Sequence, residues 1–156
     1  MKKKRIFLVS GGTGGHIFPA IALTEINKKY EYIFLVDYRT KDLIKNEKKE
    51  FYKIISSRLN TNIFLLPLNL LKIFLGILQT TFLILKLKPS LIIGFGGYTS
   101  IPSILAGKMM KIKTVIHEQN SIMGKANRLL SLFSDKTALT FKNTKYKRKD
   151  AIFTGI

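Results

Sequence analysis

The sequence contains no cysteine and few acidic residues. Without cysteine, disulfide bonds and thiolate catalysis are excluded. Only 9 of the 156 residues are Asp or Glu, and only two are His. No spaced pair of aspartates offers the oxygen ligands of a metal bound to a nucleotide sugar, so we expect neither a metal ion nor a cofactor.

Long hydrophobic runs are also missing. The longest uncharged apolar run, Ile73 to Leu85, has 13 residues, whereas a membrane-spanning helix needs about 20. The basic start, Met1 to Arg5, precedes too few apolar residues to form the core of a secretory signal. We therefore expect a cytoplasmic chain.

Positive charge dominates the sequence, which has 27 Lys and Arg and a formal net charge of +18. Such a balance favours anionic partners: nucleic acid, anionic lipid or a phosphorylated substrate. A general bias toward lysine is the alternative explanation. Because the chain has neither an aromatic-and-basic RNA signature nor a zinc-finger pattern, we expect no nucleic acid partner.

Short apolar runs alternate with helical patterns along the whole chain. The expected strands cover residues 6–10, 32–36, 52–55, 91–93, 114–117, 137–141 and 151–154. The expected helices cover residues 19–29, 40–50, 68–88, 102–110 and 125–133. This alternation predicts an α/β fold, a Rossmann-like parallel sheet with helices on both faces, in one domain over residues 1–156.

Three polar motifs each follow an expected strand: GGTGGH at 11–16, GFGGY at 94–98 and HEQN at 117–120. Ligands of open parallel sheets bind beyond the carboxyl ends of the strands. All three motifs are predicted to lie at such ends. We therefore expect them to face one cleft.

The first motif has four glycines in five positions, more than a single turn needs. Backbone N–H groups of a glycine loop can approach a phosphate because no Cβ intervenes, and the following helix adds favourable partial charge. Gly14 and Gly15 would allow that approach, and the Thr13 hydroxyl would add a hydrogen bond. A tight turn without a ligand is the alternative.

A dinucleotide-binding loop is a second interpretation of the same motif. Gly12 and Gly14 form a G-x-G, and Asp37 stands where a ribose-binding acid would lie. However, Ile17 occupies the third glycine position, and no Gly-Lys-Ser/Thr follows as in a P-loop.

Two residues of the motifs are candidate catalysts. His16 is suited to act as a general base or as a hydrogen-bond donor, with helix capping or packing as the alternative. Glu118 is suited to orient a histidine or to accept a sugar hydroxyl, with capping of the next helix as the alternative. His117 remains a third candidate for the base.

The stretch from Leu68 to Lys88 is the most hydrophobic part of the chain. On a helical wheel its polar and small residues fall within about 120°: Asn69, Lys72, Gly76, Gln79, Thr80 and Lys86. Its apolar residues cover about 200°, more than a helix lying on a core needs: Leu70, Leu71, Ile73, Phe74, Leu75, Ile77, Leu78 and Phe82. This surplus indicates contact with another subunit, a lipid tail or a membrane interface, unless the helix is deeply buried.

In this order, GGTGGH, GFGGY and HEQN resemble the bacterial MurG family over the whole chain. The resemblance implies a GT-B glycosyltransferase of two Rossmann-like domains, of which this chain is the N-terminal, acceptor-side half. It implies transfer of N-acetylglucosamine from UDP-N-acetylglucosamine to lipid I, undecaprenyl-pyrophosphoryl-N-acetylmuramoyl-pentapeptide, in peptidoglycan synthesis. It also implies a peripheral location on the cytoplasmic face of the cell membrane.

The resemblance also assigns residues. Thr13, Gly14, Gly15 and Asn120 are expected near the donor sugar nucleotide, and His16 and Glu118 near the acceptor hydroxyl or its pyrophosphate. The second glycine loop is expected to bind the lipid pyrophosphate through Gly94, Gly96, Gly97 and Tyr98. The residues expected to face an anionic membrane are Lys72, Phe74, Leu75, Leu78, Phe82 and Lys86.

The implied reaction is a direct displacement with inversion, in which a base deprotonates the acceptor hydroxyl. Backbone dipoles would stabilise the leaving UDP. Members of the family continue into a donor-binding C-terminal domain that this sequence lacks, so we expect the chain to need such a domain or subunit for activity. The alternatives are a membrane-recruiting subunit without catalytic residues and a dinucleotide-binding oxidoreductase domain.

Overall fold

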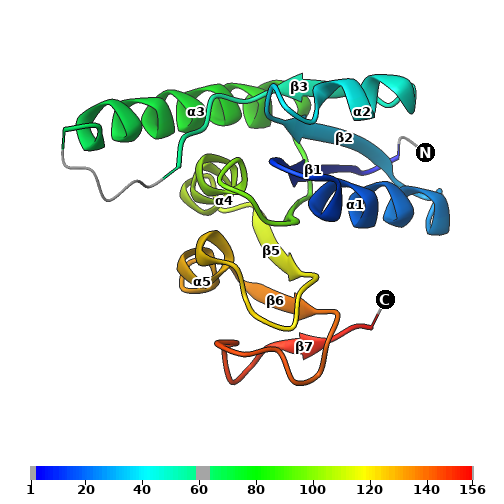
Figure 1. Cartoon of the computed structure of the whole chain (residues 1–156). Coiled ribbons are helices and arrows are strands. Elements are labelled where there is room, and N and C mark those ends of the chain that lie inside the picture. Colours follow the sequence, from blue (N-terminus) through cyan, green and yellow to red (C-terminus); the bar gives the residue numbers. More distant parts are fainter. Residues whose placement is uncertain (1–2, 59–63, 156) are drawn as a thin grey trace.

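The computed structural model describes residues 3–58 and 64–155 and contains one parallel sheet of seven strands (Figure 1). In chain order the strands are β1 Arg5–Ser10, β2 Glu31–Val36, β3 Phe51–Lys53, β4 Leu91–Gly94, β5 Lys113–Glu118, β6 Lys136–Leu139 and β7 Ile152–Phe153. The helices are α1 Gly14–Ile26, α2 Lys41–Asn46, α3 Leu66–Leu87, α4 Ser100–Met109 and α5 Lys125–Ser131. Each expected strand and helix is present, which confirms the predicted α/β class.

Helices cover both faces of the sheet, as predicted. In the interior strand β1, Phe7 and Val9 lie on one face of the sheet, where they pack with residues of α3, α4 and α5. Its alternate residues Ile6 and Leu8 pack on the other face with α1 and α2. Successive side chains of a strand point to opposite faces, so a continuous apolar run such as β1 supplies both cores.

The strand order β3-β2-β1-β4-β5-β6-β7 reverses direction between β1 and β4. Strand β2 pairs with one edge of β1, and β3 pairs with β2. After α3, β4 pairs with the other edge of β1. In open parallel sheets this reversal opens a crevice at the carboxyl ends of the two strands. Both glycine motifs lie there, since GGTGGH follows β1 and GFGGY begins at the end of β4.

The boundaries of two helices differ from expectation. The first helix begins at Gly14, not at Pro19, because Thr13 has an extended backbone and serves as its N-cap. Gly14, Gly15 and His16 therefore form the first helical turn, and Pro19 lies inside the helix. The second helix, α2, stops at Asn46, short of Glu50, because Lys48 adopts a left-handed backbone with φ of 52°.

The long helix α3 packs against the body of the protein through its small and polar residues. A Cβ on Gly76 would lie 2.1 Å from the carbonyl oxygen of Ile55, so the helix approaches the chain after β3 very closely. Asn69 and Thr80 are also buried, and each meets a serine hydroxyl, those of Ser57 and Ser103. Asn69, Gly76 and Thr80 of the polar arc therefore face inward, together with the apolar residues Ile73, Leu83 and Ile84, whereas Lys72 and Lys86 of the same arc are exposed.

The opposite side of α3 carries exposed apolar residues, which rules out the alternative of a deeply buried helix. Seven of its apolar side chains between residues 70 and 85 are exposed: Leu70, Leu71, Phe74, Leu75, Leu78, Phe82 and Leu85. We call these seven residues the apolar face of α3. In Figure 1 the N-terminal half of α3 projects beyond the other helices.

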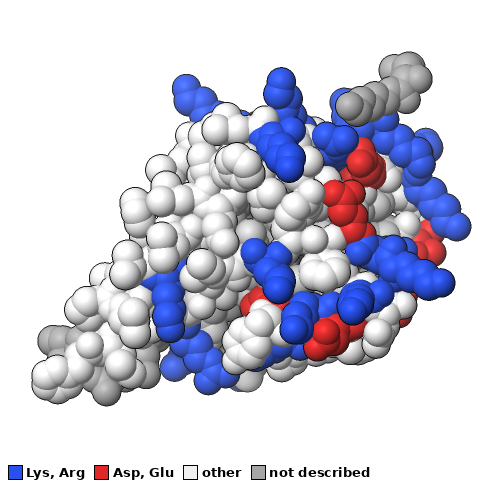
Figure 2. Space-filling model, turned by 90° about the horizontal axis from the view of Figure 1, so that it is seen from above, with Lys and Arg blue, Asp and Glu red and all other residues white. Residues whose placement is uncertain are grey.

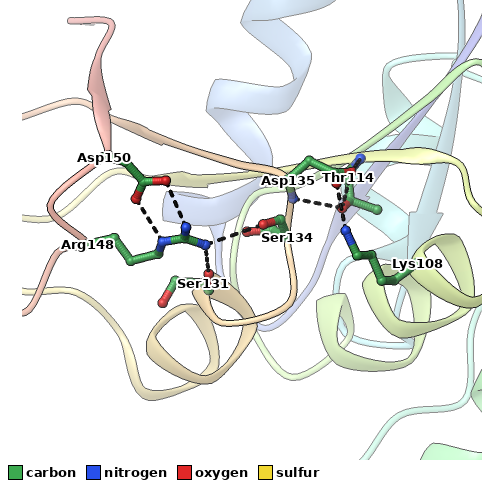
Figure 3. Close-up of polar contacts among 7 residues, drawn as sticks. All are labelled: Lys108, Thr114, Ser131, Ser134, Asp135, Arg148 and Asp150. Atoms are coloured by element: carbon green, nitrogen blue, oxygen red, sulfur yellow. Dashed lines mark hydrogen bonds and ion pairs between the residues drawn. The ribbon is translucent and has the colours of Figure 1, made fainter.

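A polar cluster joins α4, β5, α5 and the segment before β7 (Figure 3). The Asp135 carboxylate accepts hydrogen bonds from Lys108 Nζ at 2.7 Å and from the Thr114 backbone N–H at 2.8 Å. Nearby, Arg148 forms two hydrogen bonds to Asp150 and donates to the carbonyl oxygens of Ser131 and Ser134 at the end of α5. These contacts fasten the C-terminal strand to the domain.

We expect the Asp135→Asn variant to unfold more easily at neutral pH, by about 1 kcal/mol, because it loses a charge-assisted bond to Lys108. The Lys108 ammonium and the Thr114 N–H lower the pKa of Asp135 from 3.8 to about 2. The stabilisation is therefore complete above pH 3.8 and disappears as the pH falls through 2. Urea unfolding between pH 7 and pH 2.5 measures it.

The matched control is Glu47→Gln, which removes a carboxylate charge from an exposed position after α2. It should unfold like the wild type at each pH. A difference between Asp135→Asn and the wild type that does not narrow with falling pH would contradict the assignment.

Candidate functional site

The three polar motifs lie at the ends of three neighbouring strands, β1, β4 and β5. Their residues contact one another across the sheet edge. The Gln119 side chain, for example, donates from Nε2 to the Phe95 carbonyl oxygen at 2.7 Å and so joins the third motif to the second. The predicted convergence of the motifs at one rim of the sheet is therefore confirmed.

The two glycine loops meet backbone to backbone. Gly97 has a φ of +75°, and a Cβ there would lie 2.4 Å from the carbonyl oxygen of Gly11. Gly11 is itself enclosed, because a Cβ on it would lie 2.1 Å from the Thr99 hydroxyl. These two glycines are required by packing, since any side chain would push the loops apart.

Gly15 has a different environment. A Cβ on Gly15 would meet nothing closer than the Thr13 hydroxyl at 3.7 Å, and both residues are exposed. Packing does not explain a glycine at this position. The first-turn N–H groups of a helix lack intrahelical acceptors, so Gly14 and Gly15 of α1 present donors and the positive end of the helix dipole at an open surface. The arrangement suits an anionic ligand such as a phosphate.

His16 lies where the two glycine loops face each other. A Cβ on Gly96 would lie 2.9 Å from His16 Nδ1 and 3.4 Å from Asn127 Nδ2. Both side chains therefore pack closely against Gly96, and a larger residue at this position would displace them. Within the part of the chain that the structure describes, His16 Nδ1 is buried and has no hydrogen-bond partner. Nδ1 is therefore enclosed between the two loops.

Glu118 is 1% exposed and holds the third loop together. One carboxylate oxygen accepts hydrogen bonds from the backbone N–H and the side-chain amide of Asn120, at 3.0 and 2.8 Å. The other accepts from the Gly124 N–H and the Asn127 amide, each at 2.9 Å. Because four donors occupy the carboxylate, its contacts favour a positioning role over that of a base, while Asn120 lies exposed at the rim.

The other histidine, His117, packs inside the domain. Its ring lies 5.5 Å from the Phe95 ring, and its Nε2 is 3.4 Å from the Thr140 hydroxyl. Burial lowers the pKa of His117 below its ordinary value of 6.5, and the neighbouring Glu118 only partly opposes this shift. The ring is therefore neutral at pH 7, and its contacts favour packing.

Two residues of the second motif, Gly94 and Tyr98, are not part of the exposed loop surface. Gly94 belongs to β4, where a Cβ would press on Ser100 and Ile104 at 3.2 to 3.3 Å. Tyr98 is half-buried against the core and lines a separate pocket. Gly96 and Gly97 thus remain the members of this loop that lie against the first motif.

Asp37 is 3% exposed, and its carboxylate is already occupied. It accepts hydrogen bonds from the Arg39 side chain at 2.9 Å and 2.5 Å and from the backbone N–H groups of Arg39 and Thr40. The carboxylate is thus not presented to a ribose hydroxyl. This geometry does not favour the dinucleotide alternative.

A pocket of about 610 Å³ opens beside the first glycine loop, between the ends of β2 and β3 and the helix α3. Four basic side chains line it: Arg39, Lys53, Arg58 and Lys72. The sequence does not predict this pocket, because its basic residues lie in β3, in α3 and in the loops after β2 and β3, and no motif joins them. Asn127, which supports both Glu118 and the His117 carbonyl, was missed for the same reason.

We expect Glu118→Gln to destabilise the chain by about 2 to 4 kcal/mol, because the new NH₂ group would face two N–H donors that lose their acceptor. Urea unfolding at pH 7 measures the loss. Glu47→Gln, at an exposed position after α2, is the control and should be neutral. An unchanged stability of Glu118→Gln would contradict the positioning role.

Comparison with known proteins agrees with this geometry. Residues 6–139 match the family model described as "Glycosyltransferase family 28 N-terminal domain". A curated relative from Rickettsia canadensis (strain McKiel) is 42% identical over 159 residues, which cover 97% of this chain and 44% of the relative. It is named UDP-N-acetylglucosamine--N-acetylmuramyl-(pentapeptide) pyrophosphoryl-undecaprenol N-acetylglucosamine transferase. The chain thus spans less than half the length of this relative.

A solved structure gives the same assignment. The crystal structure of Acinetobacter baumannii MurG is 28% identical, with a TM-score of 0.81 over 97% of this chain and 45% of that chain. A UDP-N-acetylglucosamine 2-epimerase from Rickettsia bellii, 14% identical, has a TM-score of 0.70 over 99% of this chain and 45% of that chain, which shows the shared fold alone. The resemblance inferred from the three motifs is confirmed: the chain belongs to the glycosyltransferase family 28 N-terminal domain family.

Proposed function

We propose that this chain is the acceptor-side half of an inverting N-acetylglucosaminyltransferase that acts in peptidoglycan synthesis. The donor would be UDP-N-acetylglucosamine and the acceptor lipid I, the substrates indicated by the names of its relatives. The observation that carries the proposal is the contact of two glycine loops at the reversal point of the sheet, with the open Gly15 on one side and His16 between them.

Each part of the site has a role in this reaction. The first turn of α1, with Thr13 and Gly15, would face the donor phosphates and stabilise the charge that develops on the leaving UDP. His16 would take the proton of the acceptor hydroxyl as its oxygen attacks the anomeric carbon with inversion. Glu118 would hold Asn120 at the rim, where it reaches the donor sugar.

Transfer would also need a donor-binding domain, since the chain spans 44% of its relative from Rickettsia canadensis. The direct test is a chimaera of this chain and the C-terminal part of that enzyme, assayed for transfer of radiolabelled N-acetylglucosamine to lipid I. The proposal requires turnover by the chimaera and none by either half alone. An inactive chimaera that is folded and binds UDP-N-acetylglucosamine would refute it.

In the chimaera we expect His16→Gln to lower kcat by about 10² to 10⁴, as the loss of a general base does, with little change in KM. Steady-state kinetics with lipid I measure both constants. If the chain only recruits the acceptor to the membrane, kcat will not change. Circular dichroism of the variant controls for folding.

We further propose that the apolar face of α3 binds the membrane surface from the cytoplasmic side. By length and composition α3 is long and apolar enough to cross a membrane. However, one side of it is packed against the protein through Ile73, Gly76 and Ile84. A helix held in this way, with an apolar outer face and lysines 72 and 86, suits an orientation along the interface. Figure 2 views this side and shows a broad uncharged surface with lysine and arginine around it.

We expect the double variant Phe74→Ser and Leu78→Ser to bind anionic vesicles at least about tenfold more weakly, because two apolar side chains no longer enter the bilayer. These side chains are exposed, so the unfolding midpoint should not fall. Vesicle flotation measures binding. The control is Ile26→Ser with Leu132→Ser, two exposed apolar residues on α1 and after α5. Equal losses in both double variants would disprove membrane contact by α3.

A further inference from the structure

None of the roles proposed for the reaction uses the basic pocket beside α3. It gathers Arg39, Lys53, Arg58 and Lys72, and Asp37 is the one acid among the described residues that line it. Asp37 is buried and paired with Arg39. Three of the four cations thus remain without a carboxylate in the lining, which gives the pocket a strong preference for a multiply charged anion.

The walls of the pocket are fixed by side-chain hydrogen bonds. The Ile55 N–H donates to Gln79 Oε1 at 2.8 Å, and the Ser57 hydroxyl donates to Asn69 Oδ1 at 2.7 Å. Both bonds attach the chain after β3 to α3, where the close contact of Gly76 with Ile55 adds to them. The pocket is therefore preorganised, which lowers the ordering cost of binding.

The pocket borders both glycine motifs. A Cβ on Gly12 would lie 3.5 Å from Arg39 Nη2, so the guanidinium of this lining residue lies next to the first loop. Tyr98, the last residue of the second motif, also lines the pocket. A ligand in the pocket would therefore lie next to both motifs.

The pocket also borders the apolar face of α3. Lys72 and Gln79 line it, and Leu75 and Phe82 of the apolar face follow them at i+3. Residues three apart are neighbours on a helix surface. On this side of α3 the residues that line the basic pocket are therefore direct neighbours of residues of the apolar face.

We propose that this pocket binds the pyrophosphate of a polyprenyl lipid whose chain lies against the apolar face of α3. The inference rests on the proposed function, and it names where the acceptor's phosphates bind. Phosphates directly follow the lipid chain, so they should bind nearest to the apolar face, and the sugar beyond them should reach the glycine loops. Arg39 and Arg58 offer planar donors suited to phosphate oxygens, and Lys53 and Lys72 add point charges.

The test uses the full chain and phosphatidylcholine vesicles that contain undecaprenyl pyrophosphate. Comparison vesicles carry phosphatidylglycerol at equal total charge, and soluble inorganic pyrophosphate serves as a competitor. We expect the wild type to prefer the pyrophosphate lipid at least about tenfold, and Lys53→Gln with Arg58→Gln to lose that preference, because charged hydrogen bonds are lost. The control, Lys111→Gln with Lys113→Gln, removes two exposed charges elsewhere and should keep it.

The outcomes separate the two proposals. If the wild type prefers the pyrophosphate lipid and the pocket variant does too, the pocket is not the site, but the acceptor-side function stands. If the wild type shows no preference, the acceptor-side function fails together with the pocket. If free pyrophosphate binds as tightly as the lipid, the pocket binds phosphate without the lipid chain, and the proposed lipid site is overturned.

Discussion

The site depends on the close approach of Gly97 to the carbonyl oxygen of Gly11. This contact joins the loops after β1 and β4, two strands that pair although about 80 residues separate them in the chain. Each loop leads into a helix, α1 or α4. The contact therefore brings the N-termini of α1 and α4 to the same rim of the sheet. A side chain at either glycine would separate the loops and leave His16 without its position against Gly96.

Much of this fold is readable from the sequence, because buried parallel strands and glycine loops have strong local patterns. The alternation of runs such as 6–10 and 32–36 with helical segments predicts the sheet, and three motifs at strand ends predict their convergence. The start of α1 was not predictable, because Gly14 and Gly15 have low helix propensity and yet form its first turn.

Features that depend on packing between distant elements were not predictable. Wheel analysis of α3 separates its two sides but does not tell which side faces the protein; Gly76 against Ile55 decides that. Glu118 has the residue type of a catalyst, and only its four hydrogen bonds indicate positioning. The basic pocket arises from α3 lying over the ends of β2 and β3, a relation that no local pattern records.

The central claim is that three separate loops form one surface that binds a sugar nucleotide. It is tested most directly by titrating the ¹⁵N-labelled chain with UDP-N-acetylglucosamine and following backbone amide resonances by NMR. The account predicts that the amides of Gly15, Gly97 and Asn120 shift together along one binding curve with a single dissociation constant. Separate curves for the three amides, or shifts confined to one loop, would contradict it.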